Sequence, residues 1–135
     1  MANVTILPKD LASVLPRTWA PVLLSVLRIM TGLLFLEHGT GKIVGFPTIN
    51  MHEQWAMLYF TGLMELIGGA LFTIGFLTRP VAFVLSGYMA FAYFLAHAPR
   101  GFFPALNMGE LAVLYCFVFL YLAAAGPGPW AIDKD

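Results

Sequence analysis

The chain has 135 residues, of which 60% are hydrophobic and only 10% are charged. Soluble domains average about 25% charged residues, so this composition excludes an ordinary soluble protein and indicates a small integral membrane protein. The formal net charge is zero and the seven basic residues are scattered singly, a distribution that argues against nucleic acid as a partner.

The first 20 residues are expected to form an arm at the membrane interface. Pro8 and Pro16 bracket a short amphipathic stretch, and Trp19 is the kind of residue that anchors a chain at the level of the lipid headgroups. Pro21 follows at a position suited to the first turn of a helix, where its missing N–H group does no harm. The first membrane span is therefore predicted over residues 21–44.

Turn residues separate the next two apolar stretches. Gly45 and Pro47 interrupt the helical pattern before a second span, predicted over residues 56–77. Residues 78–80 (TRP) form a very short connection to a third span, predicted over residues 81–98. So short a link requires the second and third helices to be antiparallel neighbours.

A loop containing Pro104 precedes the fourth span, predicted over residues 106–125. A span needs about 20 apolar residues, so four spans and their connections use nearly the whole chain. We therefore expect an all-α fold, a four-helix membrane bundle that forms one domain over residues 21–127, and a C-terminal tail over residues 128–135 with a second interfacial anchor at Trp130.

The basic residues predict which way the bundle faces. Cytoplasmic loops of membrane proteins carry an excess of Lys and Arg. With both termini in the cytoplasm, four basic residues lie inside and two outside, the inner set being Lys9, Arg17, Arg79 and Lys134 and the outer set Lys42 and Arg100. We therefore expect both termini to be cytoplasmic.

Ionisable residues inside the predicted spans are the candidate site residues, because a charged side chain at the bilayer centre costs about 2.5 to 3.5 kcal/mol on insertion scales. At about 1.5 Å per residue, Arg28 in the first span and Glu65 in the second both fall at mid-membrane depth. They are therefore predicted to form a buried pair. Such a pair serves either a site or helix packing alone, since removing one partner leaves a charge stranded.

A second group of polar residues is predicted in the outer third of the membrane, contributed by three spans. It comprises His38, Lys42, His97, Asn107 and Glu110, with Arg100 nearby. A histidine titrates near neutral pH and a desolvated carboxylate can hold a proton, so the group suits proton-coupled chemistry. The alternative is a rim of polar side chains at the membrane surface.

Two cofactor alternatives follow from the same residues. His38 and His97 on facing helices have the ligand type needed for haem, although both are expected near the surface and haem is disfavoured. A metal site built from His38, His97 and Glu110 has suitable ligands, but no HxxxH or HxxE spacing supports it. No metal is therefore assigned.

Three segments in order resemble the DoxX family of small bacterial membrane proteins: LRIMTGLLFLEHGTGKIVGFP, TGLMELIGGALFTIGFLTRP and AYFLAHAPRGFFPALNMGE. With the GPGPW ending, the resemblance covers residues 22–130. It implies a multi-pass protein of the bacterial inner membrane. Carried over by position, the family's polar pattern corresponds to Arg28, His38, Lys42, Glu65, Arg79, His97, Asn107 and Glu110.

The resemblance also implies a function, because the family takes its name from a subunit associated with thiosulfate:quinone oxidoreductase, and other members are linked to oxidative stress and thiol redox. The leading expectation is therefore a membrane subunit of a quinone-linked oxidoreductase system, in which the outer polar group binds a small molecule or quinone headgroup. The chain has no flavin motif, and its single cysteine, Cys116, forms no internal disulfide or CxxC pair. Electron transfer would need a redox partner subunit or a bound quinone.

The main rival function is that of a non-catalytic accessory or assembly subunit of another membrane complex. In that case the polar residues serve packing and docking to membrane subunits or to further copies of the chain. A proton-coupled carrier is a third possibility, but four spans without internal repeats would have to oligomerise to form a pathway.

Overall fold

The structure is a computed structural model and describes residues 14–49 and 55–134. Residues 1–13, which hold most of the predicted interfacial arm, lie outside this part of the chain. Within the described residues every regular element is helical. The predicted all-α class is therefore confirmed.

The long helices follow the predicted spans closely. A 3-10 turn over Arg17–Trp19 leads into α2 (Ala20–Ile43), and α3 covers Trp55–Ile74. α4 (Thr78–Ala92) continues as a π-helical turn over Tyr93–His97 and a 3-10 turn over Ala98–Arg100. A short α5 (Pro104–Asn107) precedes the last long helix, α6 (Glu110–Ala125).

Three helix boundaries differ from expectation for identifiable reasons. α4 begins at Thr78 rather than at residue 81, so the predicted connection over residues 78–80 is the first turn of the helix, where the missing N–H of Pro80 does no harm. α3 ends at Ile74, three residues early, because the backbone turns into the left-handed region at Gly75 and again at Leu77, with φ of 70° and 52°. α6 begins at Glu110 rather than at residue 106, because Met108 (φ 62°) breaks the helix after α5. Met108 therefore divides the predicted fourth span into two helices.

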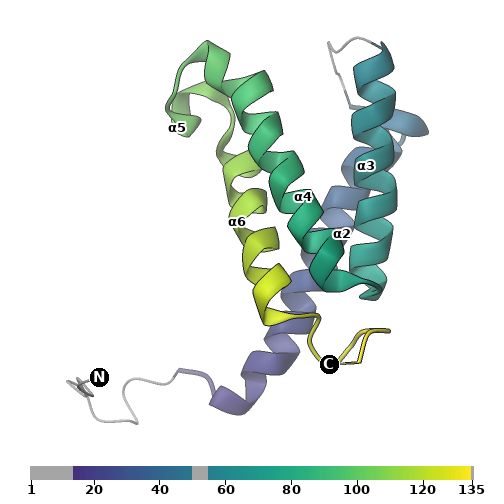
Figure 1. Ribbon diagram of the computed structural model, residues 1–135, viewed down its shortest axis with the longest axis vertical. Helices are drawn as coiled ribbons and strands as arrows, with labels where there is room; N and C mark the ends of the chain where they lie inside the picture. The colour runs from purple at the N-terminus through teal and green to yellow at the C-terminus, as the bar shows by residue number, and fades with distance from the viewer. Residues whose placement is uncertain (1–13, 50–54, 135) are drawn as a thin grey trace, which may run out of the picture.

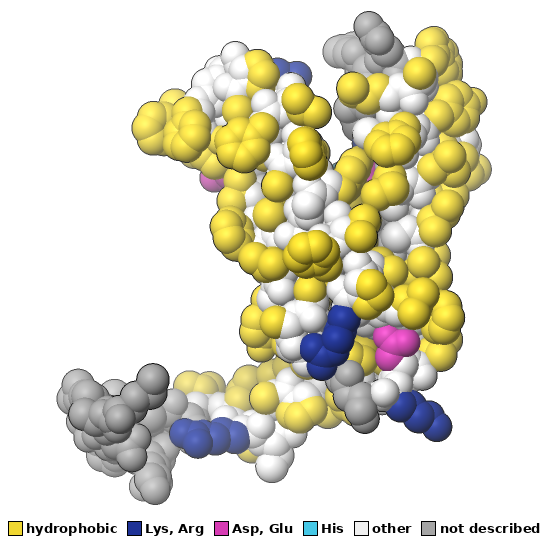
Figure 2. Space-filling model, viewed as in Figure 1, with side chains coloured by type: hydrophobic (Ala, Val, Ile, Leu, Met, Phe, Trp, Pro, Cys, Tyr) yellow, Lys and Arg dark blue, Asp and Glu magenta, His cyan; other side chains and the backbone are white. Residues whose placement is uncertain are grey.

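Among the described residues, three helical segments are long and apolar enough to cross a membrane: Arg17–Ile43, Trp55–Ile74 and Thr78–Arg100. α6 is a shorter apolar helix of 16 residues, which corresponds to about 24 Å. Figure 2 shows hydrophobic side chains along the length of α3 and α4, with charged side chains gathered mainly at the lower end. This surface suits a lipid environment.

The helices pack as two pairs, α2 with α3 and α4 with α6 (Figure 1). The pairs converge at the end that holds the α3–α4 turn and the C-terminal tail, and they separate toward the opposite end. Where they meet, the Phe119 ring lies 5.1 Å from the rings of Phe35 and Phe72, measured between centroids. Aromatic packing thus joins α6 to both α2 and α3.

Glycines allow α2 and α3 to lie very close together. A Cβ atom at Gly39 would fall 2.4 Å from the backbone nitrogen of Leu66, and one at Gly69 would fall 2.7 Å from that of Leu36. Small residues serve this purpose in membrane helices.

The four-helix bundle and the cytoplasmic placement of the termini remain predictions, although the start of α2 and the tail lie at the same end.

Candidate functional site

A buried polar cluster joins α2, α3 and α4. The Nζ atom of Lys42 lies 2.9 Å from Oε1 of Glu65, and the two side chains are only 5% and 8% exposed. Lys42 also donates to Oγ1 of Thr61 at 3.2 Å, and the hydroxyl of Tyr88 donates to the same Glu65 Oε1 at 3.0 Å. We call Lys42, Thr61, Glu65 and Tyr88 the Glu65 cluster.

Local helix geometry explains how the cluster forms. Lys42 lies in the last turn of α2, where a cation is favoured by the helix dipole. Gly62 on α3 lets the lysine stem approach, since a Cβ atom there would meet Lys42 Cβ at 2.9 Å. Thr61 precedes Glu65 by one turn on α3 and donates its own hydroxyl to the Leu58 carbonyl at 3.2 Å. Its oxygen is therefore oriented to accept from the lysine.

The two oxygens of Glu65 differ in their surroundings. Oε1 accepts from both Lys42 and Tyr88, whereas Oε2 is buried and has no hydrogen-bond partner in the described part of the chain. A buried acceptor left unsatisfied costs about 1 to 3 kcal/mol. Oε2 is thus an acceptor suited to a ligand that brings a donor.

Aromatic rings pack on one side of the cluster, next to Tyr88. The ring of Phe35 meets those of Tyr88 and Tyr115 edge to face, with centroids 6.1 and 5.4 Å apart. Tyr115 also stacks on Phe119 at 5.7 Å. The cluster therefore combines a charged pair with apolar, planar neighbours.

The predicted pair of Arg28 and Glu65 is wrong. Arg28 is fully buried and donates to the carbonyls of Phe72 (2.9 Å), Thr73 (2.7 Å) and Pro127 (2.8 Å), as well as to that of Trp130. Phe72 and Thr73 are in the last turn of α3, where carbonyls have no partner within the helix. Glu65 is seven residues earlier, about 10 Å along α3.

The two histidines lie on separate helix pairs. Nδ1 of His38 contacts the Leu34 carbonyl of its own helix at 2.9 Å, and Nδ1 of His97 contacts the Asn107 carbonyl at 3.1 Å. Because a carbonyl only accepts, Nδ1 is the protonated nitrogen in each contact. His38 is near the end of α2 and His97 near the end of the α4 extension, and Figure 1 shows these ends on different arms. A shared role for the two histidines stays a prediction.

Asn107 organises the loop between α4 and α6. Its Nδ2 donates to the Gly101 carbonyl at 2.6 Å and to the Tyr93 hydroxyl at 3.3 Å, while its Oδ1 accepts from the Gly109 N–H at 2.8 Å. Tyr93 in turn donates to the Phe102 carbonyl. The contacts of Asn107 are therefore those of a residue that holds the loop in shape.

The expected outer group is thus divided. Lys42 joins Glu65, His97 joins Asn107, and Glu110 is exposed in the first turn of α6. No three His, Cys, Asp or Glu side chains in the described ranges are grouped so that they could hold a metal ion.

The sequence analysis missed Tyr88. No spacing pointed to it, since its contact with Glu65 depends on how α4 crosses α3.

Residues 23–98 match the family model DoxX. The chain belongs to the DoxX family. It is 42% identical over 123 residues to an uncharacterized protein of Haemophilus influenzae, in an alignment that covers 86% of this chain and 92% of that protein. It is 33% identical over 116 residues to the inner membrane protein YqjF of Escherichia coli, covering 81% of this chain and 88% of that protein.

No solved structure matches the chain. The matched DoxX region contains α3, α4 and nearly all of α2, and it includes all four residues of the Glu65 cluster. Together with the helices that are long enough to span a bilayer, the family membership makes this DoxX protein a multi-pass protein of the bacterial inner membrane.

Proposed function

We propose that this DoxX protein is the membrane subunit of a quinone-linked oxidoreductase system, and that its Glu65 cluster binds a polar small molecule or quinone headgroup. The observation that carries the proposal is the buried Oε2 of Glu65, which has no partner in the described chain although Oε1 has two. Structural ion pairs are stable only when their remaining hydrogen-bonding positions are satisfied. A ligand donor at Oε2 would complete this site.

The residues of the cluster fit a quinone in chemical type. The Lys42 ammonium has three N–H donors and gives two of them to Glu65 and Thr61, so the third suits a quinone carbonyl, while Glu65 Oε2 is an acceptor suited to the hydroxyl of a quinol. A bound quinone would supply the two-electron chemistry that this chain's side chains lack. The chain's own part is to bind and orient the headgroup through Lys42 and Glu65.

The site proposed here lies deeper than the outer-face site expected from the sequence. Glu65 is ten residues after the start of α3 and nine before its end, so it lies near the middle of a helix about 30 Å long. Water is scarce at that depth, and hydrogen bonds there are stronger than at the surface. This position favours a lipid-soluble ligand over a water-soluble one.

The test is the quinone content of the protein purified in mild detergent from its native membrane and extracted for mass spectrometry. Glu65→Gln keeps the size of the side chain but removes its charge, and should reduce the bound quinone about tenfold or more, because hydrogen bonds to charged groups contribute about 1.5 to 3 kcal/mol. Glu110→Gln makes the same change at an exposed carboxylate and should leave the quinone content unchanged. A wild type free of quinone would contradict the proposal.

A second candidate function, that of a non-catalytic assembly subunit, is favoured by Arg28. This buried cation contacts only backbone carbonyls among the hydrogen bonds of the described chain, so at least one polar residue inside the spans serves packing. If the Glu65 cluster served packing or docking too, Glu65→Gln would release a co-purifying membrane partner and leave the quinone content at the wild-type level.

A further inference from the structure

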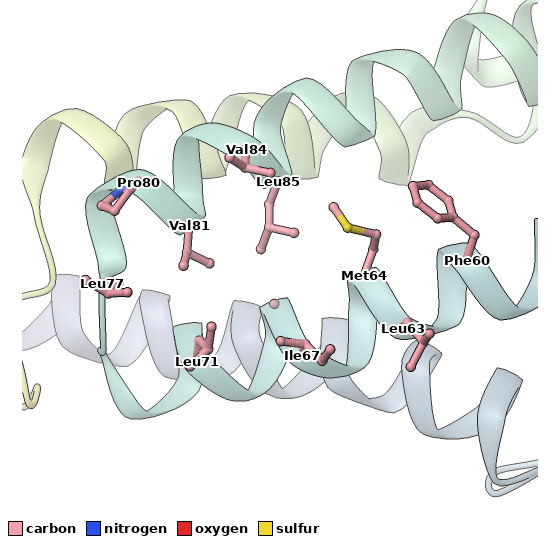
Figure 3. A pocket seen from close by; sticks show the side chains of 11 residues that line it. Phe60, Leu63, Met64, Ile67, Leu71, Leu77, Pro80, Val81, Val84 and Leu85 are labelled. Carbon is pink, nitrogen blue, oxygen red and sulfur yellow. The ribbon is translucent and has the colours of Figure 1, made fainter.

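An apolar groove of about 450 Å³ lies between α3 and α4 (Figure 3). Its walls come from both helices and include Met64, Ile67 and Leu71 of α3 and Val81, Val84 and Leu85 of α4. Gly68 lets Leu85 of α4 pack against α3 within the groove, because a Cβ atom there would lie 2.8 Å from a methyl carbon of Leu85. The groove exists because α3 and α4 separate as they leave their short turn.

The groove opens toward the surface that faces lipid. Ile67 and Val84 stand on opposite walls and are 57% and 55% exposed, although both are in helices long and apolar enough to span the bilayer. A volume in this range suits a small molecule or a chain. A flexible hydrocarbon chain in the bilayer therefore has a direct lateral route into the groove.

The groove lies next to the Glu65 cluster, although none of the four cluster residues lines it. Tyr88 lies one helical turn after Val84 and therefore on the same face of α4, and its hydroxyl donates to Glu65 Oε1 at 3.0 Å. On α3, Glu65 stands directly after Met64 and three residues before Gly68, both of which line the groove. Glu65, whose Oε2 has no partner in the described chain, is therefore at the same depth as the groove, which extends along α3 from Phe60 to Leu71.

We propose that this groove binds the hydrocarbon chain of a membrane amphiphile whose uncharged headgroup donates a hydroxyl hydrogen bond to Glu65 Oε2, as a quinol does. Charge selects this headgroup: Lys42 already neutralises Glu65, so a phosphate would bring an unmatched negative charge next to a carboxylate. The inference rests on the proposed function and extends it by assigning the ligand class and its route from the lipid.

The experiment uses the full chain in bilayers of phosphatidylethanolamine and phosphatidylglycerol. The probe is a 1,4-benzoquinol with a ten-carbon chain that carries a diazirine at mid-chain, and the control probe is the same chain without the quinol. After illumination, labelled residues are located by mass spectrometry. The quinol probe should label α3 and α4 beside the groove, whereas the control probe should label lipid-facing residues throughout the protein.

Two variants separate the groove from the headgroup site. Val84→Trp fills the groove and should abolish its labelling, while Val26→Trp, the same change at an exposed position of α2, should not. Glu65→Gln should make the quinol probe label as diffusely as the control probe. Ile67→Trp fills the groove from the opposite helix, α3, and should abolish the labelling of the groove as Val84→Trp does. Agreement between the two variants shows that the loss does not come from misfolding of one of them.

The outcomes distinguish this inference from the proposed function. Diffuse labelling by the quinol probe, in a protein that still co-purifies with quinone in a Glu65-dependent way, overturns the groove but leaves the headgroup site. Equal labelling of the groove by both probes also overturns the inference, since the groove would then hold ordinary lipid chains. Absence of quinone from the purified wild type removes both proposals.

Discussion

Arg28 and Glu65 show two ways in which a DoxX protein accommodates charge inside its spans. Arg28 donates to four backbone carbonyls, two in the last turn of α3 and two where the C-terminal tail begins. The partial negative charges of these carbonyls therefore balance the charge of Arg28. Glu65 instead pairs with Lys42 and leaves one oxygen without a partner in the described chain. Arg28 is satisfied and structural, whereas Glu65 is arranged for a further donor.

The role of Arg28 predicts a large loss of stability on substitution. Arg28→Met keeps an unbranched side chain but removes the donor to four carbonyls, of which that of Phe72 keeps a second donor in the Gly75 N–H, and each buried group left unsatisfied costs about 1 to 3 kcal/mol. We expect a fall of several kcal/mol, measured as a lower midpoint of thermal unfolding by circular dichroism in detergent. Arg28→Lys should restore only part of the lost stability, because an ammonium lacks the wide fork of the guanidinium. Arg100→Met, at an exposed position, should change little; a similar loss in both Met variants would contradict this role.

The sequence showed that these two residues must be sequestered, but it assigned their partners wrongly. Depth along a helix can be counted from sequence, and it placed Arg28 and Glu65 at similar heights. The structure ends α3 at Ile74 and folds the tail back onto Arg28, so carbonyls rather than a carboxylate surround it. Backbone acceptors have no sequence signature, because every residue carries the same carbonyl group whatever its side chain.

At the scale of elements, the glycine-lined contact between α2 and α3 places Lys42 beside Glu65. Without a hydrophobic drive between helices in lipid, close packing and polar contacts hold the pair together. Gly39, Gly62 and Gly69 let the two backbones approach at successive turns. The close approach at these glycines puts Glu65 in a tight interface between α2 and α3.

This contact predicts opposite effects for two identical substitutions. Gly69→Ala would place a Cβ atom 2.7 Å from the Leu36 nitrogen, forcing α2 and α3 apart, and overpacking typically costs about 1 to 3 kcal/mol. At Gly87, on α4, nothing lies within 4 Å of the added atom, so Gly87→Ala should be neutral or gain up to about 1 kcal/mol of helix propensity. Thermal unfolding midpoints check the pair, and equal midpoints would show that the contact is looser than described.

The C-terminal tail connects the ends of several helices. Ile132 and Asp133 donate their N–H groups to the carbonyls of Ile74 and Gly75, at 3.2 and 2.8 Å. The carboxylate of Asp133 accepts from the N–H groups of Leu77 (2.9 Å) and Thr78 (2.7 Å), which caps the start of α4. The tail thus closes the end of the molecule where the helix pairs converge.

The cap predicts a pH dependence of stability. The hydrogen bond from the Thr78 N–H, aided by Leu77 and by the charge of Arg28, lowers the pKa of Asp133 below its ordinary value. Because the folded pKa is the lower one, the stabilisation is complete above the unfolded pKa and is lost as the pH falls through the folded pKa. Asp133→Asn should therefore lower the unfolding midpoint at pH 6, and the gap from wild type should close toward pH 2. A gap independent of pH would contradict this account.

For the whole molecule, hydropathy and turn residues predicted the helical class and the approximate ends of the long helices, because apolar length and proline or glycine breaks are local properties. They did not predict two helix pairs that separate at one end, since this depends on how side chains pack across helices far apart in sequence. Hence the outer group expected as one site is divided, with His97 and Asn107 on one arm and Lys42 on the other.

The central claim is that Glu65 binds a quinone headgroup inside the membrane. The most direct measurement is the molar ratio of quinone to protein in wild type, Glu65→Gln and Glu110→Gln, each purified from native membranes and each shown to be folded by circular dichroism. The account predicts that quinone is retained in the wild type and in Glu110→Gln but lost from folded Glu65→Gln. Equal ratios in all three proteins would contradict it.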